Sequence, residues 1–272
     1  MHVIMNNHIS RAAVRPAAVA GLFYPQDPAE LSSTVEALLG VPHAPGQLPK
    51  AVIVPHAGYA YSGPVAGRAY GSLGPHARSL RRILLLGPSH RVWFQGLAVP
   101  RAREFATPLG SVRLDAAALT EVRQLPAVIC ADEPHALEHS LEVQLPFLQR
   151  VAPAAEIVPV VAGAATPAQV ARLINALWGG ADTLIVASSD LSHYHPYPIA
   201  QALDSATAQA ILDGREDLTG DQACGCVVLN GLVRAVRSRR LRGELLDLRN
   251  SGDTAGDRAR VVGYGAFGFY HA

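Results

Sequence analysis

The sequence has few cysteines, no long apolar run and no excess of either charge, and each shortage excludes a class of protein. Three cysteines in 272 residues cannot build a disulfide framework, and Cys224 and Cys226 are too close in sequence for a favourable bridge. This cysteine usage favours a reducing environment, so we expect a cytoplasmic protein. No stretch approaches the roughly 18 unbroken apolar residues of a membrane span. Residues 1–10 also lack the charged start and apolar stretch of a signal peptide.

The charges of the chain nearly cancel, since 23 basic and 22 acidic residues leave a formal charge of +1. That balance gives no electrostatic argument for binding nucleic acid or an anionic membrane. A Walker loop, a Rossmann glycine fingerprint and a Gly-x-Ser-x-Gly motif are all missing, so the usual signals of nucleotide binding and of serine hydrolases are absent. A hydrophobic content of 49% supports a substantial core. We expect one domain spanning residues 1–272, in which residues 1–14 form a flexible N-terminal extension.

Short apolar runs alternate with segments of helical periodicity along the chain. Strands are predicted at residues 51–54, 83–86, 96–100, 157–161, 183–187, 245–249 and 261–270. Helices are predicted at residues 28–40, 64–70, 167–178, 199–212 and 222–236, from 115 onward, and at 138–151 with a kink at Pro146. Asp27 and Thr166 each precede a proline and are typical N-caps, and residues 58–63 are predicted as a glycine-rich turn. The alternation predicts an α/β fold with a doubly wound, mostly parallel central sheet that has helices on both faces.

Three of the predicted strands end shortly before a histidine. Residues 51–54 lead to His56, residues 83–86 lead to His90, and residues 183–187 lead to Asp190 and His193. The carboxyl ends of such buried parallel strands meet at one edge of an open α/β sheet, where ligands bind. Imidazole is the commonest metal ligand in proteins and titrates near neutral pH. We therefore expect the three histidines in one crevice, as a metal site or an acid–base site.

Two further groups of residues have more than one interpretation. Asp190 precedes His193 by three residues, so it could orient an imidazole, bind the metal directly or cap a following turn. His139 and Glu142 lie one helical turn apart in the segment 138–142. They could bind metal or polarise a second imidazole, or they could form a buried His–Glu pair in an amphipathic helix. The residues alone leave both choices open.

Cys224 lies at the predicted start of a helix. A helix N-terminus lowers the pKa of a thiol and favours the thiolate, which can bind a metal or act as a nucleophile. A buried thiol that only fills space is the alternative. The neighbouring Cys226 has no assigned role, and Cys130 follows an apolar run, so we expect it in the core. His195 adjoins Pro196 and is expected in a loop.

Several segments together resemble the Memo family, which is similar in fold to the class III extradiol ring-cleaving dioxygenases. They occur in family order from about residue 15 to the end of the chain: Arg15–Pro25, Pro55–Tyr59, Leu86–His90, Thr107–Gly110, Glu138–Pro146, Ser188–His193 and Ala223–Gly225. The resemblance implies an α/β fold with one pocket that can hold a metal. Bacterial and archaeal members resemble one component of a three-part system, so the implied partners are an AMMECR1-type protein and a radical SAM protein.

The resemblance also implies roles for individual residues. His56 and His90 match the two histidine ligands of the dioxygenase-like site, and His193 matches the histidine that acts as acid and base. Cys224 matches the family cysteine near the metal, where the true dioxygenases carry a carboxylate. Two histidines with one carboxylate leave iron(II) open positions for substrate and oxygen, whereas a thiolate favours softer metals such as copper(I). The implied cofactor is therefore iron(II) or copper.

Three functions fit these residues. The first is a metal-dependent oxidoreductase that uses dioxygen on a small aromatic substrate. Its metal is held by His56, His90 and Cys224, while His193 moves protons and Asp190 orients the cluster. The second is a non-catalytic module whose same pocket binds a peptide or a partner segment. The third is a hydrolase that uses a metal-activated water, although a single carboxylate near the site argues against a two-metal form.

Overall fold

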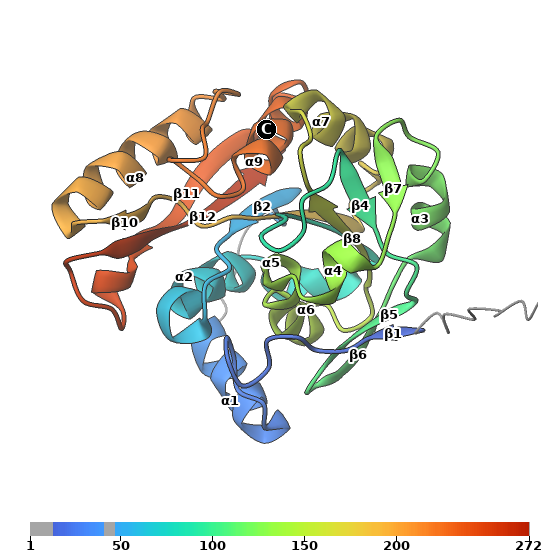
Figure 1. The fold of residues 1–272 in the computed structure, drawn as a ribbon, viewed down its shortest axis with the longest axis horizontal. Helices are drawn as coiled ribbons and strands as arrows, with labels where there is room; N and C mark the ends of the chain where they lie inside the picture. The colour runs from blue at the N-terminus through green and yellow to red at the C-terminus, as the bar shows by residue number, and fades with distance from the viewer. Residues whose placement is uncertain (1–12, 41–46, 272) are drawn as a thin grey trace, which may run out of the picture.

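Two β-sheets and the helices that cover them make up the part of the chain that this computed structural model describes, residues 13–40 and 47–271 (Figure 1). The larger sheet has the strand order β10-β12-β2-β9-β3-β8-β4-β7, with β11 paired to β12. Its strands are β2 (Ala51–Val54), β3 (Arg82–Pro88), β4 (Leu97–Val99), β7 (Val128–Cys130), β8 (Glu156–Ala162), β9 (Thr183–Ser188), β10 (His193–His195), β11 (Arg242–Asn250) and β12 (Val261–Tyr270). The smaller sheet, ordered β1-β5-β6, consists of β1 (Val14–Arg15), β5 (Glu104–Thr107) and β6 (Gly110–Arg113).

The centre of the larger sheet is parallel. Neighbouring strands β2, β9, β3 and β8 all run in the same direction, and nearly all of their residues are buried. Continuous apolar runs are typical of such strands, because helices cover the sheet on both sides. Antiparallel pairs occur only towards the edges, where β4 joins β8 and β12 joins β2, β10 and β11. The carboxyl ends of β2, β9 and β3 therefore lie side by side at one edge of the sheet.

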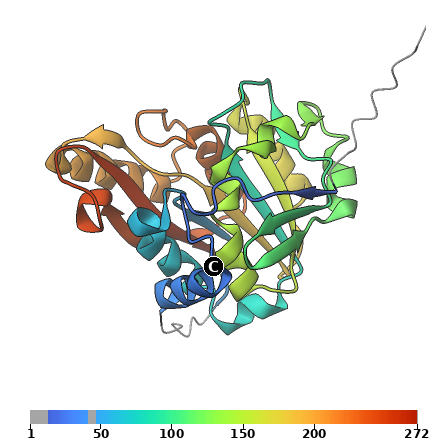
Figure 2. The same cartoon turned by 60° about the horizontal axis from the view of Figure 1, so that its bottom comes forward.

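Helices pack on both faces of this sheet (Figures 1 and 2). They are α1 (Pro28–Leu39), α2 (Tyr59–Gly71), α3 (Ala116–Val122), α4 (Glu133–Ala136), α5 (His139–Glu142), α6 (Leu145–Val151), α7 (Pro167–Ala176), α8 (Tyr197–Leu212) and α9 (Cys226–Arg237). The pair α7 and α9 covers one face, and α2, α5 and α6 cover the other. Asp27 and Thr166 cap α1 and α7 as predicted. The predicted doubly wound α/β fold with a mostly parallel centre is confirmed.

The predicted glycine-rich turn at residues 58–63 is wrong, because α2 begins at Tyr59 and contains Pro64. The glycines of this segment serve close helix packing instead. A Cβ atom at Gly67 would lie 2.1 Å from the carbonyl oxygen of Leu38 in α1, and one at Gly63 would lie 2.8 Å from the Leu38 side chain. Only glycine lets the two helices approach this closely.

Three other predicted boundaries also differ from the structure. The single helix at residues 138–151 is divided into α5 and α6, since Pro146 occupies the first turn of α6, where its missing N–H costs little. The helix predicted from residue 222 begins at Cys226. Residues 1–12 of the predicted N-terminal extension lie outside the described residues, but Val14 pairs with Glu104 and belongs to the smaller sheet. Cys130 is half-buried in the edge strand β7 rather than in the core.

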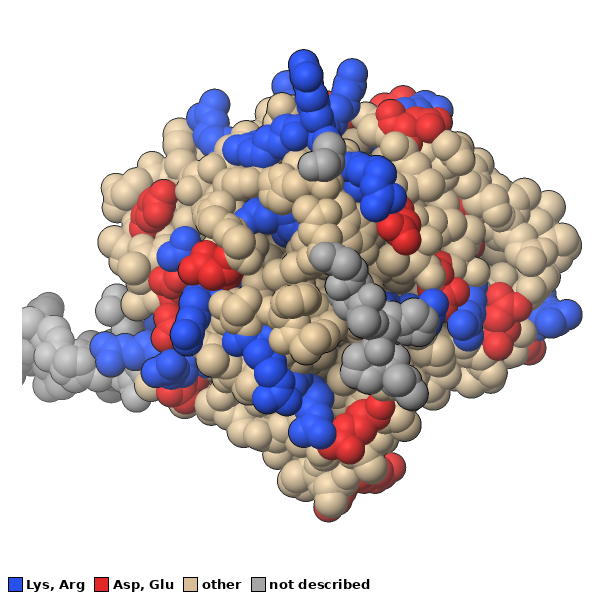
Figure 3. Space-filling model, turned by 180° about the vertical axis from the view of Figure 1, so that it is seen from behind, with Lys and Arg blue, Asp and Glu red and all other residues tan. Residues whose placement is uncertain are grey.

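The described residues show no helix with the length and apolar character needed to cross a bilayer. Over the face drawn in Figure 3, basic and acidic side chains lie interspersed, in keeping with the formal charge of +1.

A buried histidine in α4 makes stability depend on pH. His135 is 2% exposed, its Nε2 lies 3.1 Å from the carbonyl oxygen of Ala98, and burial lowers its pKa to about 3. In the unfolded chain its pKa is about 6.5. The unfolded state therefore binds the extra proton first, so this contribution to stability is present above pH 6.5 and is lost as the pH falls towards 3. Between pH 7 and pH 5, the free energy of unfolding of the wild type should therefore fall by about 2 kcal/mol more than that of His135→Phe.

Urea unfolding at the two pH values measures this difference. The exposed His76 provides the matched control, because His76→Phe should leave the pH dependence of the wild type unchanged. An identical loss of stability in the wild type and in His135→Phe would assign the acid sensitivity to other groups.

Candidate metal centre

The candidate site is assembled from the ends of three adjacent strands. His56 follows β2, His90 follows β3, and Asp190 follows β9, which lies between the other two. The ends of β2 and β9 are level, since Val54 is paired in register with Ser188, and Leu86 of β3 is paired with Ala187 of β9. Each strand stops at proline, serine or glycine residues that turn the chain sharply. Side chains far apart in the sequence therefore meet at one edge of the sheet.

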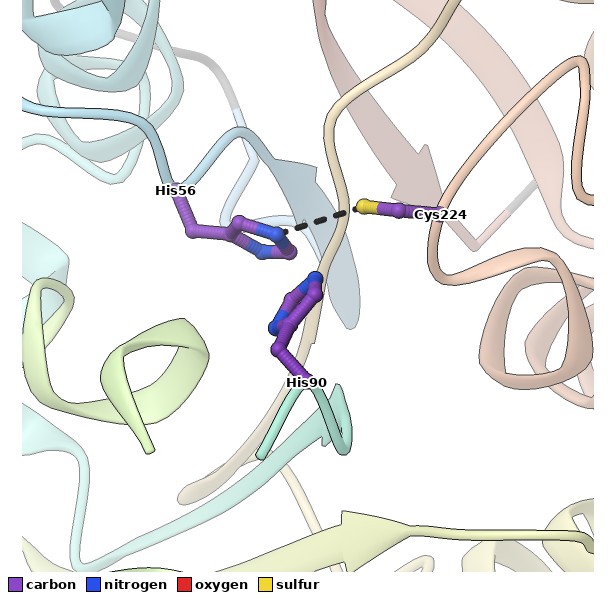
Figure 4. Close-up of side chains that lie close together, drawn as sticks. All are labelled: His56, His90 and Cys224. Carbon is purple, nitrogen blue, oxygen red and sulfur yellow. Dashed lines mark hydrogen bonds between the residues drawn. The ribbon is translucent and has the colours of Figure 1, made fainter. Parts of the chain in front are cut away.

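Three side chains at this edge each present an atom that can bind a metal. One donor atom from each of His56, His90 and Cys224 lies within 4.8 Å of the other two. Cys224 Sγ is 3.2 Å from His56 Nε2 and comes from the turn before α9, as Figure 4 shows. His56 is fully buried, Cys224 is half-buried and His90 is more exposed. Ligand bonds of roughly 2.0–2.3 Å place two donors of one ion about 3–4.6 Å apart, so the cluster is close to the size that one ion requires.

The tautomer of His56 is determined by its hydrogen-bond partners. Ser188 donates its only hydroxyl hydrogen to the carbonyl oxygen of Ser140, at 2.6 Å. Its oxygen therefore accepts, both from Gln144 Nε2 and from His56 Nδ1 at 2.9 Å. The proton of the neutral imidazole is thus on Nδ1, and the lone pair of Nε2 points at Cys224. Burial and the neighbouring imidazoles keep the pKa of His56 well below its usual value, so the ring is neutral at pH 7.

His90 is fixed in the same way by a carboxylate. Glu138 Oε1 accepts from His90 Nδ1 at 2.9 Å, and Oε2 accepts from the backbone N–H of His90 at 2.6 Å. Burial opposes the charge of Glu138, but these hydrogen bonds and that from the backbone N–H of Ser140 lower its pKa to about 2. The carboxylate can only accept, so Nδ1 carries a proton and Nε2 is the ring nitrogen left for a ligand. A carboxylate behind a metal-binding histidine is a common arrangement in metalloproteins.

The remaining polar residues surround this cluster. His193 Nδ1 donates to the carbonyl oxygen of Leu191 at 2.8 Å, and burial lowers its pKa, so Nε2 is a proton acceptor. The ring of His139 stacks on that of His90, with centroids 4.6 Å apart, and burial lowers its pKa to about 4. Asp190 accepts from the backbone N–H of His56 at 2.7 Å, and burial raises the pKa of this carboxyl to about 7.

The expected lowering of the Cys224 pKa is wrong for the metal-free protein. Burial, followed by the nearby Asp190 carboxyl, raises the pKa of the thiol to about 12. The first residue of α9 is Cys226, so Cys224 lies outside the helix whose N-terminus was expected to stabilise the thiolate. The neutral thiol can donate to His56 Nε2. Cys224 would therefore have to lose a proton in order to bind a metal.

A cavity of about 450 Å³ opens beside the cluster. It is lined by His56, His90, His139, Asp190, His193, Tyr194, His195, Gly220, Asp221 and Cys224. The structure thus brings together both catalytic candidates, all three metal candidates and His139. His195, which we expected in a loop, lies in β10 and lines the same cavity. A volume of this size suits a small molecule.

A family model described as Memo-like protein matches residues 15–267. The chain belongs to the Memo family. A MEMO1 family protein of Ignicoccus hospitalis is 36% identical, with 94% of this chain and 98% of that protein covered. One of Aquifex aeolicus is 34% identical, with 92% and 97% covered. Among solved structures, an uncharacterized Escherichia coli K12 protein, JW3007, aligns with a TM-score of 0.48 and 14% identity over 79% of this chain and 98% of that one.

Glu142, the other secondary candidate, has a different environment in this Memo family protein. It is fully buried, forms an ion pair with Arg15, and accepts from the backbone N–H groups of Ala18 and Val19 and from the hydroxyl of Tyr24. It is absent from the residues that line the cavity. Glu142 is thus not paired with His139, and its carboxylate holds the segment 15–24 instead.

Glu138 and Ser188 were not predicted as functional residues, although both lie inside segments that resemble the Memo family. Glu138 caps the first turn of α5 and is 48 positions from His90, and Ser188 is 132 positions from His56. The only signal in the sequence was their position beside other candidates, His139 and Asp190.

Proposed function

We propose that this Memo family protein binds one iron(II) or copper ion through His56, His90 and Cys224 and oxidises a small molecule in the adjoining cavity. The observation that carries the proposal is the pair of fixed tautomers. Ser188 and Glu138 hold protons on the Nδ1 atoms, so the Nε2 atoms are the ring nitrogens left for a ligand beside a cysteine sulfur. Two imidazoles and one thiol that meet in a partly buried site are a donor set suited to one shared cation.

The donor set supports a redox metal. A thiolate with two imidazoles suits copper(I) and iron better than magnesium or calcium, which prefer oxygen ligands. Three protein ligands leave room at the ion for further ligands. When bound, iron or copper supplies the capacity to exchange electrons with dioxygen and a substrate, which none of these side chains has.

The protein's own residues supply positioning and proton transfer. His193 accepts a proton at Nε2 from a substrate hydroxyl in the cavity, and its bond to the carbonyl oxygen of Leu191 holds the ring in place. Asp190 fixes the backbone of His56, and Glu138 orients His90. The cavity admits a molecule the size of a single aromatic ring and its substituents, so a small aromatic substrate is the class that we propose.

The proposal is tested on protein purified anaerobically without chelators and then loaded with iron(II) or copper(I). We expect about one ion per chain by elemental analysis. Bound metal should slow alkylation of Cys224 at least about tenfold, because only a free thiolate reacts. Half-buried Cys130, in β7, is the internal control and should react at the same rate with and without metal.

The same preparation gives a pH test with a definite sign. Because binding releases the thiol proton, affinity should fall about tenfold for each unit by which the pH is lowered. Equal alkylation of Cys224 in the two states would remove it from the ligand set. A chain that takes up neither metal would instead favour a module that binds a peptide through the histidines.

A further inference from the structure

Tyr194 has a backbone conformation that a bulky residue rarely adopts. Its φ is 63°, in the left-handed region, and it lies between His193 and His195 in β10. The register of β10 against β12 shifts at this point, which marks a β-bulge. Bulges often occur beside functional sites, where they redirect a side chain.

The bulge changes which side chains face the cavity. In a regular strand, Tyr194 would point to the opposite face from His193 and His195. Here all three consecutive residues line the cavity beside the candidate metal cluster. The distortion therefore adds a third consecutive residue, Tyr194, to the wall of the site.

The Tyr194 ring is largely exposed and makes few contacts within the protein. Tyr194 is 63% exposed, with the guanidinium of Arg260 at 5.1 Å from the ring centroid and the His193 ring at 5.7 Å. Left-handed backbone is unfavourable for a residue with a Cβ atom, and glycine would adopt it without strain. Residues with strained backbone conformations cluster at active sites and at sites that hold ligands.

We propose that Tyr194 is a substrate-contacting residue whose ring stacks against a planar aromatic substrate. The inference rests on the proposed function and adds to it the part of the substrate that is recognised. Arg260 lies over the ring of Tyr194, so a ligand in the cavity stacks on the ring surface that this guanidinium leaves uncovered. An offset pair of aromatic rings adds affinity beyond the area that it buries, and a saturated ring of the same size cannot provide it.

The test compares catechol with trans-1,2-cyclohexanediol, which also carries two adjacent hydroxyls but is not planar. Binding of each is measured by calorimetry or ligand-observed NMR on the metal-free full chain. We expect the wild type and Tyr194→Phe to prefer catechol by about three- to tenfold. Tyr194→Gly should bind both compounds equally, while its melting temperature rises by about 2–4 °C because the strain is relieved.

Arg240→Gly is the matched control. Arg240 also has a positive φ, 56°, and is absent from the residues that line the cavity, so its replacement should raise the melting temperature without changing the catechol preference. A Tyr194→Gly variant that melts lower, or one that retains the preference, would show that the residue is structural. Wild-type protein that binds the two compounds equally would also overturn the proposal. None of these outcomes depends on metal, so the inference and the proposed metal site can fail separately.

Discussion

Alanine at His56 or at His90 is expected to reduce bound iron or copper from about one ion per chain to almost none. Each substitution removes one of the three proposed protein ligands, and both imidazole rings are held in place by the Nδ1 bonds behind them. His193→Ala should retain a full ion, because this ring is assigned to proton transfer. Elemental analysis of the folded variants, with circular dichroism to confirm folding, gives the comparison.

A fourth variant distinguishes a residue that binds the metal from a residue that only orients a metal-binding histidine. Glu138→Gln keeps the size of the side chain but loses the charge that orients His90, so we expect affinity to fall about 10- to 100-fold while the protein can still be fully loaded at high metal concentration. If His193→Ala lost its metal while His56→Ala kept it, the two roles would be the reverse of those proposed.

The strand ends could be predicted from the sequence, and the reason is local. Buried parallel strands are continuous apolar runs, and they stop at proline, glycine or serine. His56, His90 and Asp190 directly follow such runs, so their shared position at one sheet edge followed from the pattern. That β9 lies between β2 and β3 could not be read from the pattern, since strand order depends on how the whole chain crosses over.

The contacts behind the site could not be predicted, because they join residues far apart in the sequence. Nothing near His90 indicates that Glu138 is its partner, and nothing near Ser188 indicates that its hydroxyl is committed to Ser140. The raised pKa of Cys224 has the same origin. Its proximity to a helix was visible in the sequence, but the burial that outweighs this proximity is a property of the folded chain.

The contacts of Glu142 predict that replacing this residue strongly destabilises the protein. This carboxylate is the only acidic side chain paired with buried Arg15 among the described residues. It also accepts from the backbone N–H groups of Ala18 and Val19, at 2.8 and 2.9 Å, and from the hydroxyl of Tyr24 at 2.6 Å. Arg15 in turn donates to two carbonyl oxygens of the segment before α5, those of His135 and Glu138. The pair therefore joins the N-terminal strand to the segment that carries Glu138.

Glu142→Gln is expected to lower the free energy of unfolding by about 3–5 kcal/mol, because it leaves the guanidinium of Arg15 buried without an opposite charge. The melting temperature should fall by about 10 °C. Glu36 and Arg150 form the matched control, since their ion pair of 2.5 Å is exposed and Glu36→Gln should cost less than about 1 kcal/mol.

Glu142 lies one helical turn from His139, so it could be a structural carboxylate or a metal ligand. The metal content of the Glu142→Gln protein, measured well below its melting temperature, decides between these two roles. A structural carboxylate predicts a destabilised chain that still binds about one ion, because its oxygens face Arg15 and the segment 15–24 rather than the cavity. A ligand predicts the opposite combination, little loss of stability and no bound metal. The number and burial of its contacts favour the first result, and loss of metal from a folded variant would place Glu142 in the ligand set.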